Sequence, residues 1–591
     1  MKKTIIMSLS AVLFFLVGCE DTFLDLKDLD SITEEVFFDV PQDFEDASNH
    51  FYRGLHSPTV RNPGNGSANN NGFNMITDFG TELNAWVQNW GQGINTATDI
   101  DIYWGNSYYY IRETNILLQK ADEYVDNGGS AAEISEYVAT AYFFRAYHHF
   151  RLLKRFGGVP IVTEVTNVDS EILFAPRNSR YEVAAQILAD LDLAIASLPT
   201  SATGEDLGKI SATAALAYKA RVLLFEGTFE KYVGTATDFE GSGTGNNSAA
   251  YIAEAVTTAK MVMDSGAYEI WNQNADPNMD NNSYKWLFTL EGTDSNPGGY
   301  TKASNNEFII QTIYSFPDNT IGSIFTQVAE ERNAPTQVAL DMYSCLDGLP
   351  IDKSLQFQGY AKQSDQFINR DRRMWANFGR SIPADGSNII TELGTTILTN
   401  LSNWKWRTWN QYRSVRTEAY NYPHLRYAEV LLTYAEALYE RDGSISDADL
   451  NLTVNLIRDR AGIAPLTNTL VTANNLNMLE EIRRERTVEL YMEDNNHWND
   501  LHRWDIAKDV LNDDLIGYVI EGTEYENDTD LFDPAIAIYD FKDDYPSGKG
   551  PVRALIIDPV STRVYSHKNY LWPLPINETV RNPNLLQNPD W

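Results

Sequence analysis

The chain has 591 residues, more than a single hydrophobic core usually holds, so two or more packed lobes are expected. Its 82 Asp and Glu outnumber its 46 Lys and Arg, and the resulting formal charge of −36 argues against nucleic acid and anionic lipid headgroups as partners, because the acidic surface would be repelled by both. With 43% hydrophobic and 22% charged residues the sequence is typical of a folded protein, and its two cysteines exclude a disulfide framework.

The first residues have the pattern of a bacterial lipoprotein signal. Lys2 and Lys3 precede an apolar run from Ile5 to Val17 that is too short to span a bilayer, and Gly18 stands directly before Cys19. We therefore predict a signal peptide over 1–18, lipid attachment at the Cys19 thiol and an extended tether over 19–42. The alternative is an uncleaved anchor with an incidental cysteine. Because the acidic surface is repelled by lipid headgroups, the lipid itself must provide the attachment.

Hydrophobic periodicity predicts a helical-repeat region over 43–269. A first helix near 43–55 is followed by a loop rich in Gly, Asn and Pro, from Arg61 to Gly72. Small residues such as Ala215 and Ala220 would let a neighbouring helix approach closely, as in the antiparallel helix pairs of tetratricopeptide-type repeats. The other helices predicted in this region cover 104–127, 131–155, 180–198, 209–228 and 249–266.

The pattern changes over 270–420, which is rich in Asn, Asp, Gly, Ser and Trp and shows only short strand-like runs such as Glu307 to Tyr314. We interpret it as an irregular second lobe built of loops and small strands. Helices return over 421–591, at 425–441, 446–461 and 475–494, and the tail from 513 is expected to be loop-rich. The predicted fold class is mainly α, with a tetratricopeptide-like helical-repeat scaffold and an irregular loop-rich lobe containing short strands.

Glutamates repeat at four-residue spacing at Glu485, Glu489 and Glu493, followed by His497. Stacked carboxylates repel one another unless a cation neutralises them, but the Glu-to-His spacing does not suit a di-metal site. Nearby arginines, among them Arg458 and Arg460, favour a structural ion-pair network. The sequence contains no phosphate-binding loop, nucleophile elbow, paired-cysteine site or complete calcium loop, so we predict no catalytic residue, no cofactor and no metal.

Aromatic residues next to amide side chains are the candidate ligand contacts. Trp86 and Trp90 lie near Asn89, while Tyr284 and Trp286 follow a polar loop. An aromatic ring in a loop can stack on the apolar face of a sugar while neighbouring amides bond its hydroxyl groups. We predict these five residues as ligand-binding; the alternative is that each ring belongs to the hydrophobic core.

Short motifs over nearly the whole chain resemble those of the SusD/RagB family of outer-membrane nutrient-binding lipoproteins. In chain order they are Phe23-Leu24-Asp25 after the lipoprotein cysteine, Trp104 with Tyr108 and Asn115, Arg145-Ala146, Phe156 to Pro160, Asp347-Gly348, Asn369-Arg370-Asp371, Arg426 to Leu432, Arg460-Ala461-Gly462, Glu485-Arg486, Asp500-Leu501, Arg503-Trp504, Pro573-Leu574-Pro575 and Asn588-Pro589. Arg372 departs from the family, which usually has proline at that position.

The resemblance implies an α-helical fold on tetratricopeptide-like repeats, with the irregular lobe over 270–420 as its variable, ligand-binding part. It also implies a lipid-anchored protein on the cell surface at the outer membrane. It also implies a partner, a TonB-dependent transporter of the SusC type, and a non-catalytic role in passing oligosaccharides to it. Peptide capture, known for some members, and a lipid-anchored glycoside hydrolase remain as alternatives. The shared motifs belong to the scaffold, so they identify no ligand-binding residue.

Overall fold

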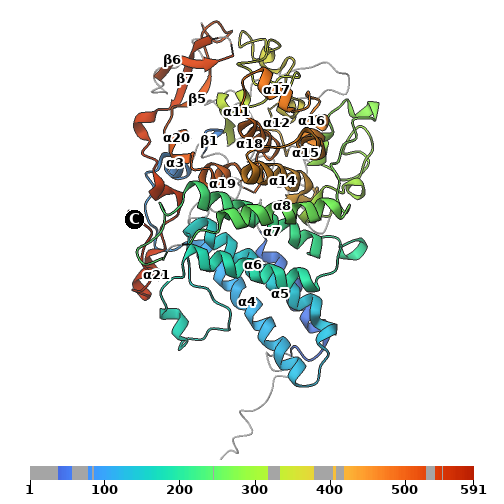
Figure 1. The fold of residues 1–591 in the computed structure, drawn as a ribbon, viewed down its shortest axis with the longest axis vertical. Coiled ribbons are helices and arrows are strands. Elements are labelled where there is room, and N and C mark those ends of the chain that lie inside the picture. Colours follow the sequence, from blue (N-terminus) through green and yellow to red (C-terminus); the bar gives the residue numbers. More distant parts are fainter. Residues whose placement is uncertain are drawn as a thin grey trace, which may run out of the picture.

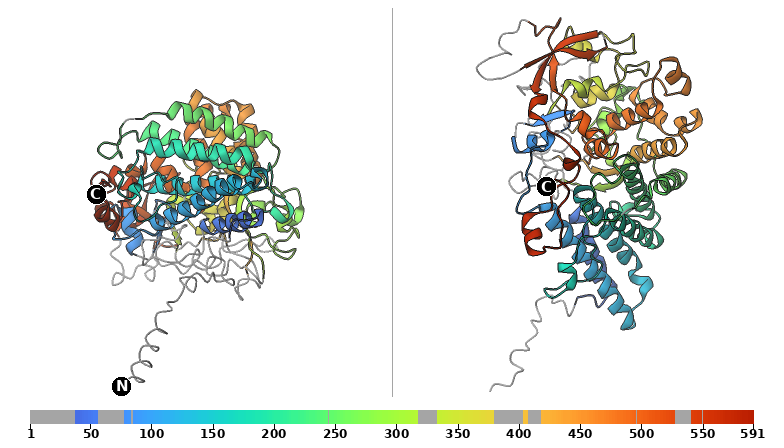
Figure 2. Two further views of the ribbon diagram at one scale, coloured as in Figure 1. Left: turned by 90° about the horizontal axis from the view of Figure 1, so that it is seen from below. Right: turned by 60° about the vertical axis from the view of Figure 1, so that its left-hand side comes forward.

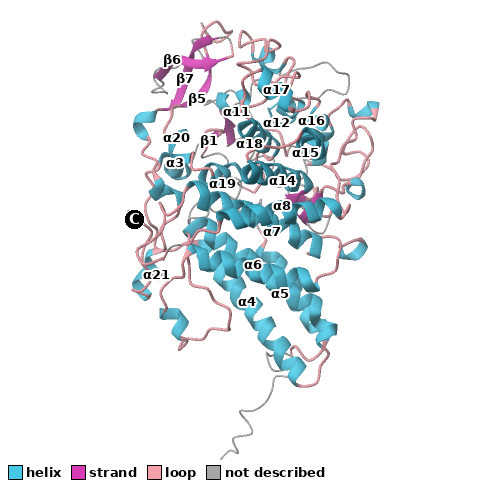
Figure 3. Cartoon of the chain, in the orientation of Figure 1, coloured by secondary structure: helices cyan, strands magenta, loops and turns pink. Residues whose placement is uncertain are grey.

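The computed structural model describes residues 37–55, 77–82, 85–243, 245–316, 333–378, 403–406, 418–494, 496–526, 540–548 and 550–591. Most elements in these ranges are helices and the strands are short, so the predicted mainly α fold is confirmed (Figure 3). The segment 1–18, Cys19 and the loop from Arg61 to Gly72 lie outside the described residues. Across the described ranges, no helix is both long enough and apolar enough to cross a membrane.

A series of helices packed side by side forms the body of the molecule (Figures 1 and 2). Each helix in the series from α4 to α8 packs against the next, and α8 packs against α14, which brings the C-terminal part of the chain onto the same stack. The helices predicted over 43–269 are thus confirmed, while their kinship to tetratricopeptide repeats stays a prediction. The bounds are α2 Pro41–Phe51, α4 Ile102–Asp126, α5 Ala131–Phe156, α6 Arg180–Ser197, α7 Ala212–Tyr232, α8 Ser248–Asp264 and α14 Tyr427–Asp442.

Local sequence signals fix where these helices begin and end. The Asp101 carboxylate accepts hydrogen bonds from the backbone N–H groups of Tyr103 and Trp104, at 2.8 and 3.3 Å, and so caps α4. A capping box between Ser179 and Glu182 starts α6. Gly157 ends α5 with a φ of 74°, a conformation that glycine adopts without strain.

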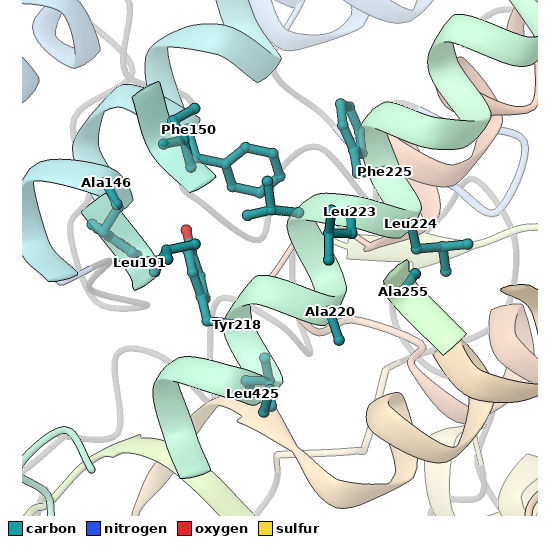
Figure 4. Packing of buried hydrophobic residues seen from close by; sticks show 14 of the residues in the cluster. Ala146, Phe150, Leu191, Tyr218, Ala220, Leu223, Leu224, Phe225, Ala255 and Leu425 are labelled. Atoms are coloured by element: carbon teal, nitrogen blue, oxygen red, sulfur yellow. The ribbon is translucent and has the colours of Figure 1, made fainter. Parts of the chain in front are cut away.

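Helix α7 lies at the centre of the largest hydrophobic core. It is buried almost without interruption from Thr213 to Glu230, as expected for a helix that is surrounded by other elements. Figure 4 shows Tyr218, Leu223 and Phe225 of this helix with Phe150 of α5 and Leu191 of α6. This packing fixes the relative positions of α5, α6 and α7.

Shorter helices follow α14, and α15 to α18 lie in the upper half of Figure 1. The helix predicted at 446–461 is divided at Thr453, whose φ of −133° and ψ of −95° are not helical. The shorter helices of this part are α15 Asp447–Leu452, α16 Val454–Ala461, α17 Asn468–Ala473, α18 Met478–Glu489, α19 Asn496–Arg503, α20 Ala507–Val510 and α21 Ile576–Arg581.

Two small antiparallel pairs of strands join distant parts of the chain. The predicted strand near 307–314 is present as β2 Phe308–Thr312, which pairs with β4 Tyr422–Arg426. In the second pair, β1 Gly80–Glu82 lies beside β3 Asn333–Pro335. Within 270–420 the other described elements are short, among them α9 Ser283–Leu287, α11 Gln337–Asp341 and α12 Arg372–Phe378. The division of the chain at 42, 269 and 420 stays a prediction.

The tail from 513 differs from its prediction, because it contains a three-stranded antiparallel sheet in the order β5-β7-β6. Its strands are β5 Leu515–Val519, β6 Asp540–Ser547 and β7 Gly550–Asp558. Strand β6 has the sequence DFKDDYPS, whose charges and proline hide the alternation that marks a strand. Pairing with β7, and not the local pattern, makes this segment extended.

Candidate ligand-binding site

Helix α3 (Ala85–Gln92) carries three of the residues predicted to contact a ligand. Trp90 is only 4% exposed, and its ring stacks on that of Trp572 with the centroids 3.2 Å apart. A ring covered in this way has no free face for a sugar, so Trp90 is a core residue in this structure. Asn89 is half-buried, and its contact with a ligand stays a prediction. The side chain of Trp86 lies outside the part of the chain that the structure describes.

Tyr284 and Trp286 lie on α9 and are 3% and 5% exposed. The Tyr284 hydroxyl donates a hydrogen bond to the carbonyl oxygen of Glu489 at 2.9 Å and accepts one from Lys405 Nζ at 2.9 Å. Both rings belong to a core cluster that also contains Trp406. The expectation that they present a stacking face to a ligand therefore does not agree with the structure, because both rings are buried in this cluster.

The glutamates of α18 form the ion-pair network that the sequence predicted. Glu489 contacts Arg426 at 2.6 Å and Arg373 at 2.8 Å, and it also pairs with Arg460. Burial raises the pKa of Glu489, but these three guanidinium groups outweigh burial and hold that pKa at about 2. Of these partners the sequence named only Arg460, because Arg373 and Arg426 are far from α18 along the chain.

Metal binding has no support in the described residues. His497, which follows the glutamates, bonds Asp78 through Nε2 at 2.7 Å. Over the ranges that the structure describes, no group of His, Cys, Asp and Glu is arranged to hold a metal ion. The acidic loop at 276–282 contains a short helical turn in which the Asp276 carboxylate accepts the backbone N–H of Asn278.

A pocket that opens beside α5 is the candidate ligand-binding site; we call it the α5 pocket. Tyr147, Arg151 and Lys154 project from one face of α5, because residues three and four apart share a helix face. The beginning of α4, the centre of α7, the start of α19 and the C-terminal segment complete it. Its lining residues are Tyr103, Tyr147, Arg151, Lys154, Arg155, Tyr218, Asp494, Trp498, Asn499 and Trp572.

Aromatic rings and two arginines form the walls of the α5 pocket. The Arg155 guanidinium lies 3.2 Å from the Trp572 ring centroid and 4.2 Å from that of Tyr103. Arg155 is also paired with the Asp101 carboxylate at 2.6 Å, so its charge is neutralised. Arg151 lies 5.0 Å from the Tyr103 ring centroid. These stacked cations and rings make a rigid wall with apolar faces.

Three polar groups of the α5 pocket have no hydrogen-bonding partner among the described residues: the Lys154 ammonium, the Asn499 amide and the Tyr218 hydroxyl. Burial lowers the pKa of Lys154 to about 8, and the neighbouring Asp494 carboxylate opposes part of that shift. Polar groups in a pocket that the fold leaves without partners are available to a ligand. The combination of apolar ring faces and free donors suits a sugar or another polar ligand with a flat apolar side.

Another hollow, near α2, is less suited to a ligand. It is lined in part by Tyr52, Lys209 and Gln311. Each of these side chains is already bonded: the Tyr52 hydroxyl to the Ile210 backbone N–H at 2.8 Å, Lys209 to Glu45 and Asp206, and Gln311 to Asn421. The α5 pocket is therefore the better candidate.

Sequence reasoning did not identify the α5 pocket. Its residues come from five separate segments, and only the fold brings them together. One signal was present: Arg151, Lys154 and Arg155 lie within five residues of each other in a chain where acids outnumber bases by 82 to 46. Such a local excess of positive charge in an acidic protein indicates either a ligand-binding function or a buried acidic side chain that pairs with it.

Two family models match separate parts of this chain. The model of a family described as the SusD family matches residues 329–591, and that of a family described as starch-binding and associating with the outer membrane matches residues 22–224. A curated relative, SusD-like protein P2 of Formosa agariphila, is 24% identical over 98% of this chain and 97% of its own length. SusD-like protein P38 of the same species is 28% identical over 22% of this chain and 24% of its own length.

Solved structures share the fold at low sequence identity. A SusD-like carbohydrate-binding protein from Bacteroides fragilis aligns with a TM-score of 0.67 and 22% identity, over 93% of this chain and 100% of its own. The surface glycan-binding protein A of Bacteroides fluxus aligns with a TM-score of 0.58 and 19% identity, over 95% and 100% of the two chains. The agreement over nearly the full length confirms the overall architecture.

Proposed function

Because this chain belongs to the SusD family, we propose that it is a non-catalytic protein of the cell surface that binds oligosaccharides and delivers them to a SusC-like, TonB-dependent transporter of the outer membrane. The family description, starch-binding and associating with the outer membrane, supports a carbohydrate ligand and this location. The observation that carries the proposal for this chain is the α5 pocket, where ring faces lie beside an amide, a hydroxyl and an ammonium that have no hydrogen-bonding partner in the described part of the chain.

A binding role suits the α5 pocket better than hydrolysis does. Glycosidases use two carboxyl groups that face each other about 5 to 9.5 Å apart across the bond to be cleaved. Among the described residues that line the pocket, the one carboxylate is that of Asp494, and Arg221 holds it at 2.8 Å. Prolonged incubation of the protein with glycans should therefore produce no new reducing ends, and their appearance would contradict the non-catalytic role.

Asn499→Ala tests the pocket directly. Asn499 is half-buried and has no described partner, so its loss should leave the melting temperature unchanged while weakening retention by glycans on affinity gels. The matched control is Asn127→Ala, because exposed Asn127 ends α4 at the opposite end from Tyr103, about 35 Å away at 1.5 Å per residue. Equal retention of wild type and Asn499→Ala on every glycan of a broad screen would contradict the proposed site.

The lipid anchor belongs to the same proposal. Diacylglycerol on Cys19 would hold this acidic protein at a membrane that its charge does not favour. Cys19→Ala should move the protein from the outer-membrane fraction to the soluble fraction, and Cys345→Ala, at a buried cysteine, is the control that should not. Co-purification with a TonB-dependent transporter from the membrane fraction tests the partner.

A further inference from the structure

The α5 pocket has an excess of positive charge that the described residues do not neutralise. Of its three cations, Arg155 is paired with Asp101, whereas Arg151 and Lys154 have no carboxylate within ion-pair distance among the described residues. Arg151 donates to the Gly54 carbonyl oxygen at 3.2 Å and lies over aromatic rings. Lys154 lies 4.9 Å from the Phe150 ring centroid and donates no hydrogen bond in the described part of the chain.

The carboxylate nearest to this charge is already committed elsewhere. Asp494 lines the pocket, but its Oδ2 is held by Arg221 at 2.8 Å. Arg221 also binds Glu429 at 2.6 Å, and Glu429 lies 3.5 Å from Arg486. The charges that face Lys154 from α7, α14 and the segment before α19 therefore form a closed network of their own, and that network supplies Lys154 with no direct partner.

We infer that the α5 pocket receives a negatively charged substituent of the bound glycan, a carboxylate or a sulfate ester, with Lys154 as the group that binds it. This inference rests on the proposed function. An ammonium group that is largely withdrawn from water without a counter-ion is costly, and an anion placed beside it recovers that cost through charge-assisted hydrogen bonds. A neutral sugar would leave the charge uncompensated.

The size and lining of the pocket favour a substituent on a sugar. The cavity measures about 80 Å³, much smaller than the roughly 300 to 1,000 Å³ of sites that enclose a whole ligand. It therefore admits a charged group or one end of a ligand, while Asn499 at its edge can bond a hydroxyl. The Trp572 and Tyr103 rings beside it suit a sugar ring that carries the charge.

The net charge of −36 does not prevent this selectivity. At physiological ionic strength, surface charges are screened over about 8 Å, whereas a partly buried charge is screened much less. The negative charge of the surface then slows the approach of a polyanion, whereas the charge inside the pocket determines which substituent of the glycan is bound. Binding of a charged glycan should for this reason strengthen, or stay constant, as moderate salt is added.

The test compares charged glycans with their own neutral forms by isothermal titration calorimetry. One pair is an oligogalacturonate and its carboxyl-reduced product; the other is a sulfated galactan oligomer and its desulfated product. The wild type should bind one charged form at least about tenfold more tightly than its neutral counterpart, which corresponds to about 1.4 kcal/mol. The two pairs distinguish a carboxylate from a sulfate ester.

Lys154→Gln should abolish that preference, because it should weaken binding of the charged form at least about tenfold more than binding of the neutral form. Lys260→Gln is the control, because Lys260 is an exposed lysine paired with Asp264 on α8. Should Lys154→Gln fail to fold, the wild type supplies the second measurement: its preference should decline between pH 7 and pH 9.5, as an ammonium with a pKa near 8 loses its charge.

Three outcomes would overturn the inference, and they differ in what they say about the proposed function. Equal affinity for the charged and neutral forms would overturn the anionic subsite and leave glycan binding intact. Absence of binding to every glycan would overturn both. Binding of poly-glutamate, lost in Lys154→Gln, without binding of any glycan would assign the pocket to an acidic peptide instead.

Discussion

The rings of Trp90 and Trp572 lie nearly parallel, 17° apart, and join α3 to the C-terminal segment. The Trp572 ring also contacts the Arg155 guanidinium, and both residues line the α5 pocket. This pair of tryptophans therefore supports one wall of the pocket. Buried Trp90 therefore supports the α5 pocket from behind, because its ring holds that of Trp572 in position.

Trp90→Ala should lower the free energy of unfolding by about 3 to 5 kcal/mol, the usual cost of truncating a large buried aromatic side chain. Urea denaturation measures this cost, and glycan retention should fall together with stability. Phe174→Ala is the control: Phe174 is 56% exposed, so its loss should change stability by at most about 0.5 kcal/mol. A Trp90→Ala protein with wild-type stability and no glycan binding would restore Trp90 to the ligand-contact role.

Glu489→Gln should be strongly destabilising, by about 3 to 5 kcal/mol at pH 7, because it leaves the buried charges of Arg373, Arg426 and Arg460 partly uncompensated. The pKa of Glu489 in the folded protein, about 2, is below its ordinary value of 4.5. Its stabilising contribution is therefore fully present above pH 4.5 and is lost as pH falls toward 2. Urea titrations of both proteins at several pH values should show the difference shrinking over that range.

The control for this network is Asp264→Asn, which breaks the exposed pair with Lys260 and should cost less than about 1 kcal/mol. Similar losses for Glu489→Gln and Asp264→Asn would show that the buried network contributes little to stability.

Helices were the part of the fold most accessible from sequence. The bounds of α4 and α5 agree with prediction within a few residues, because apolar periodicity, the Asp101 cap and Gly157 are all local signals. The extended conformation of β6 depends on its pairing with β7, which a local pattern does not contain. The same limit applies to the ring of Tyr284, whose covering residues, Lys405 and Glu489, are distant in sequence.

The site was harder to predict for a related reason. An aromatic side chain with a polar edge suits both a core and a sugar-binding face, so composition does not distinguish the two environments. Burial decides between them, and burial is a property of the assembled fold. The α5 pocket depends on this assembly even more. Arg151 and Lys154 lack a carboxylate partner among the described residues, and this is evident only from the fold, in which Asp101 pairs with Arg155 and Asp494 pairs with Arg221.

Glu230→Gln should stabilise the protein at pH 8 and have no such effect at pH 4.5. Burial raises the pKa of Glu230 from 4.5 to about 7, an effect that the Asn247 backbone N–H opposes and the Glu226 carboxylate reinforces. The stability associated with this raised pKa is fully present below pH 4.5 and is lost as pH rises through 7, since the charge must then form in a buried site. The neutral amide avoids that charge.

The expected gain for Glu230→Gln at pH 8 is about 1 to 3 kcal/mol after allowance for partial solvent screening. Thermal unfolding at pH 4.5, 6 and 8 measures it, and Glu240→Gln, at an exposed site, should show no comparable gain at any of these values. If Glu230→Gln changed the stability by the same amount at all three pH values, the substitution would act through packing and not through charge.

Gly158→Ala and Gly105→Ala should change the free energy of unfolding in opposite directions. A Cβ at Gly158 would collide with the carbonyl oxygen of Asn178 and come within 2.8 Å of the Ser179 carbonyl carbon, both of them backbone atoms. The segment that caps α6 must shift to remove this collision, and we expect a loss of stability of about 3 kcal/mol.

At Gly105, within α4, a Cβ would meet nothing within 4 Å, so alanine should stabilise the protein by about 0.5 to 1 kcal/mol through helix propensity. Chemical denaturation of the two variants against wild type gives both values. A neutral Gly158→Ala would mean that the 158–161 segment moves away from the N-terminus of α6 at little cost, and the hydrogen bond from the Asn178 N–H to the Val159 carbonyl oxygen, 3.2 Å in this structure, would then be weakened as well.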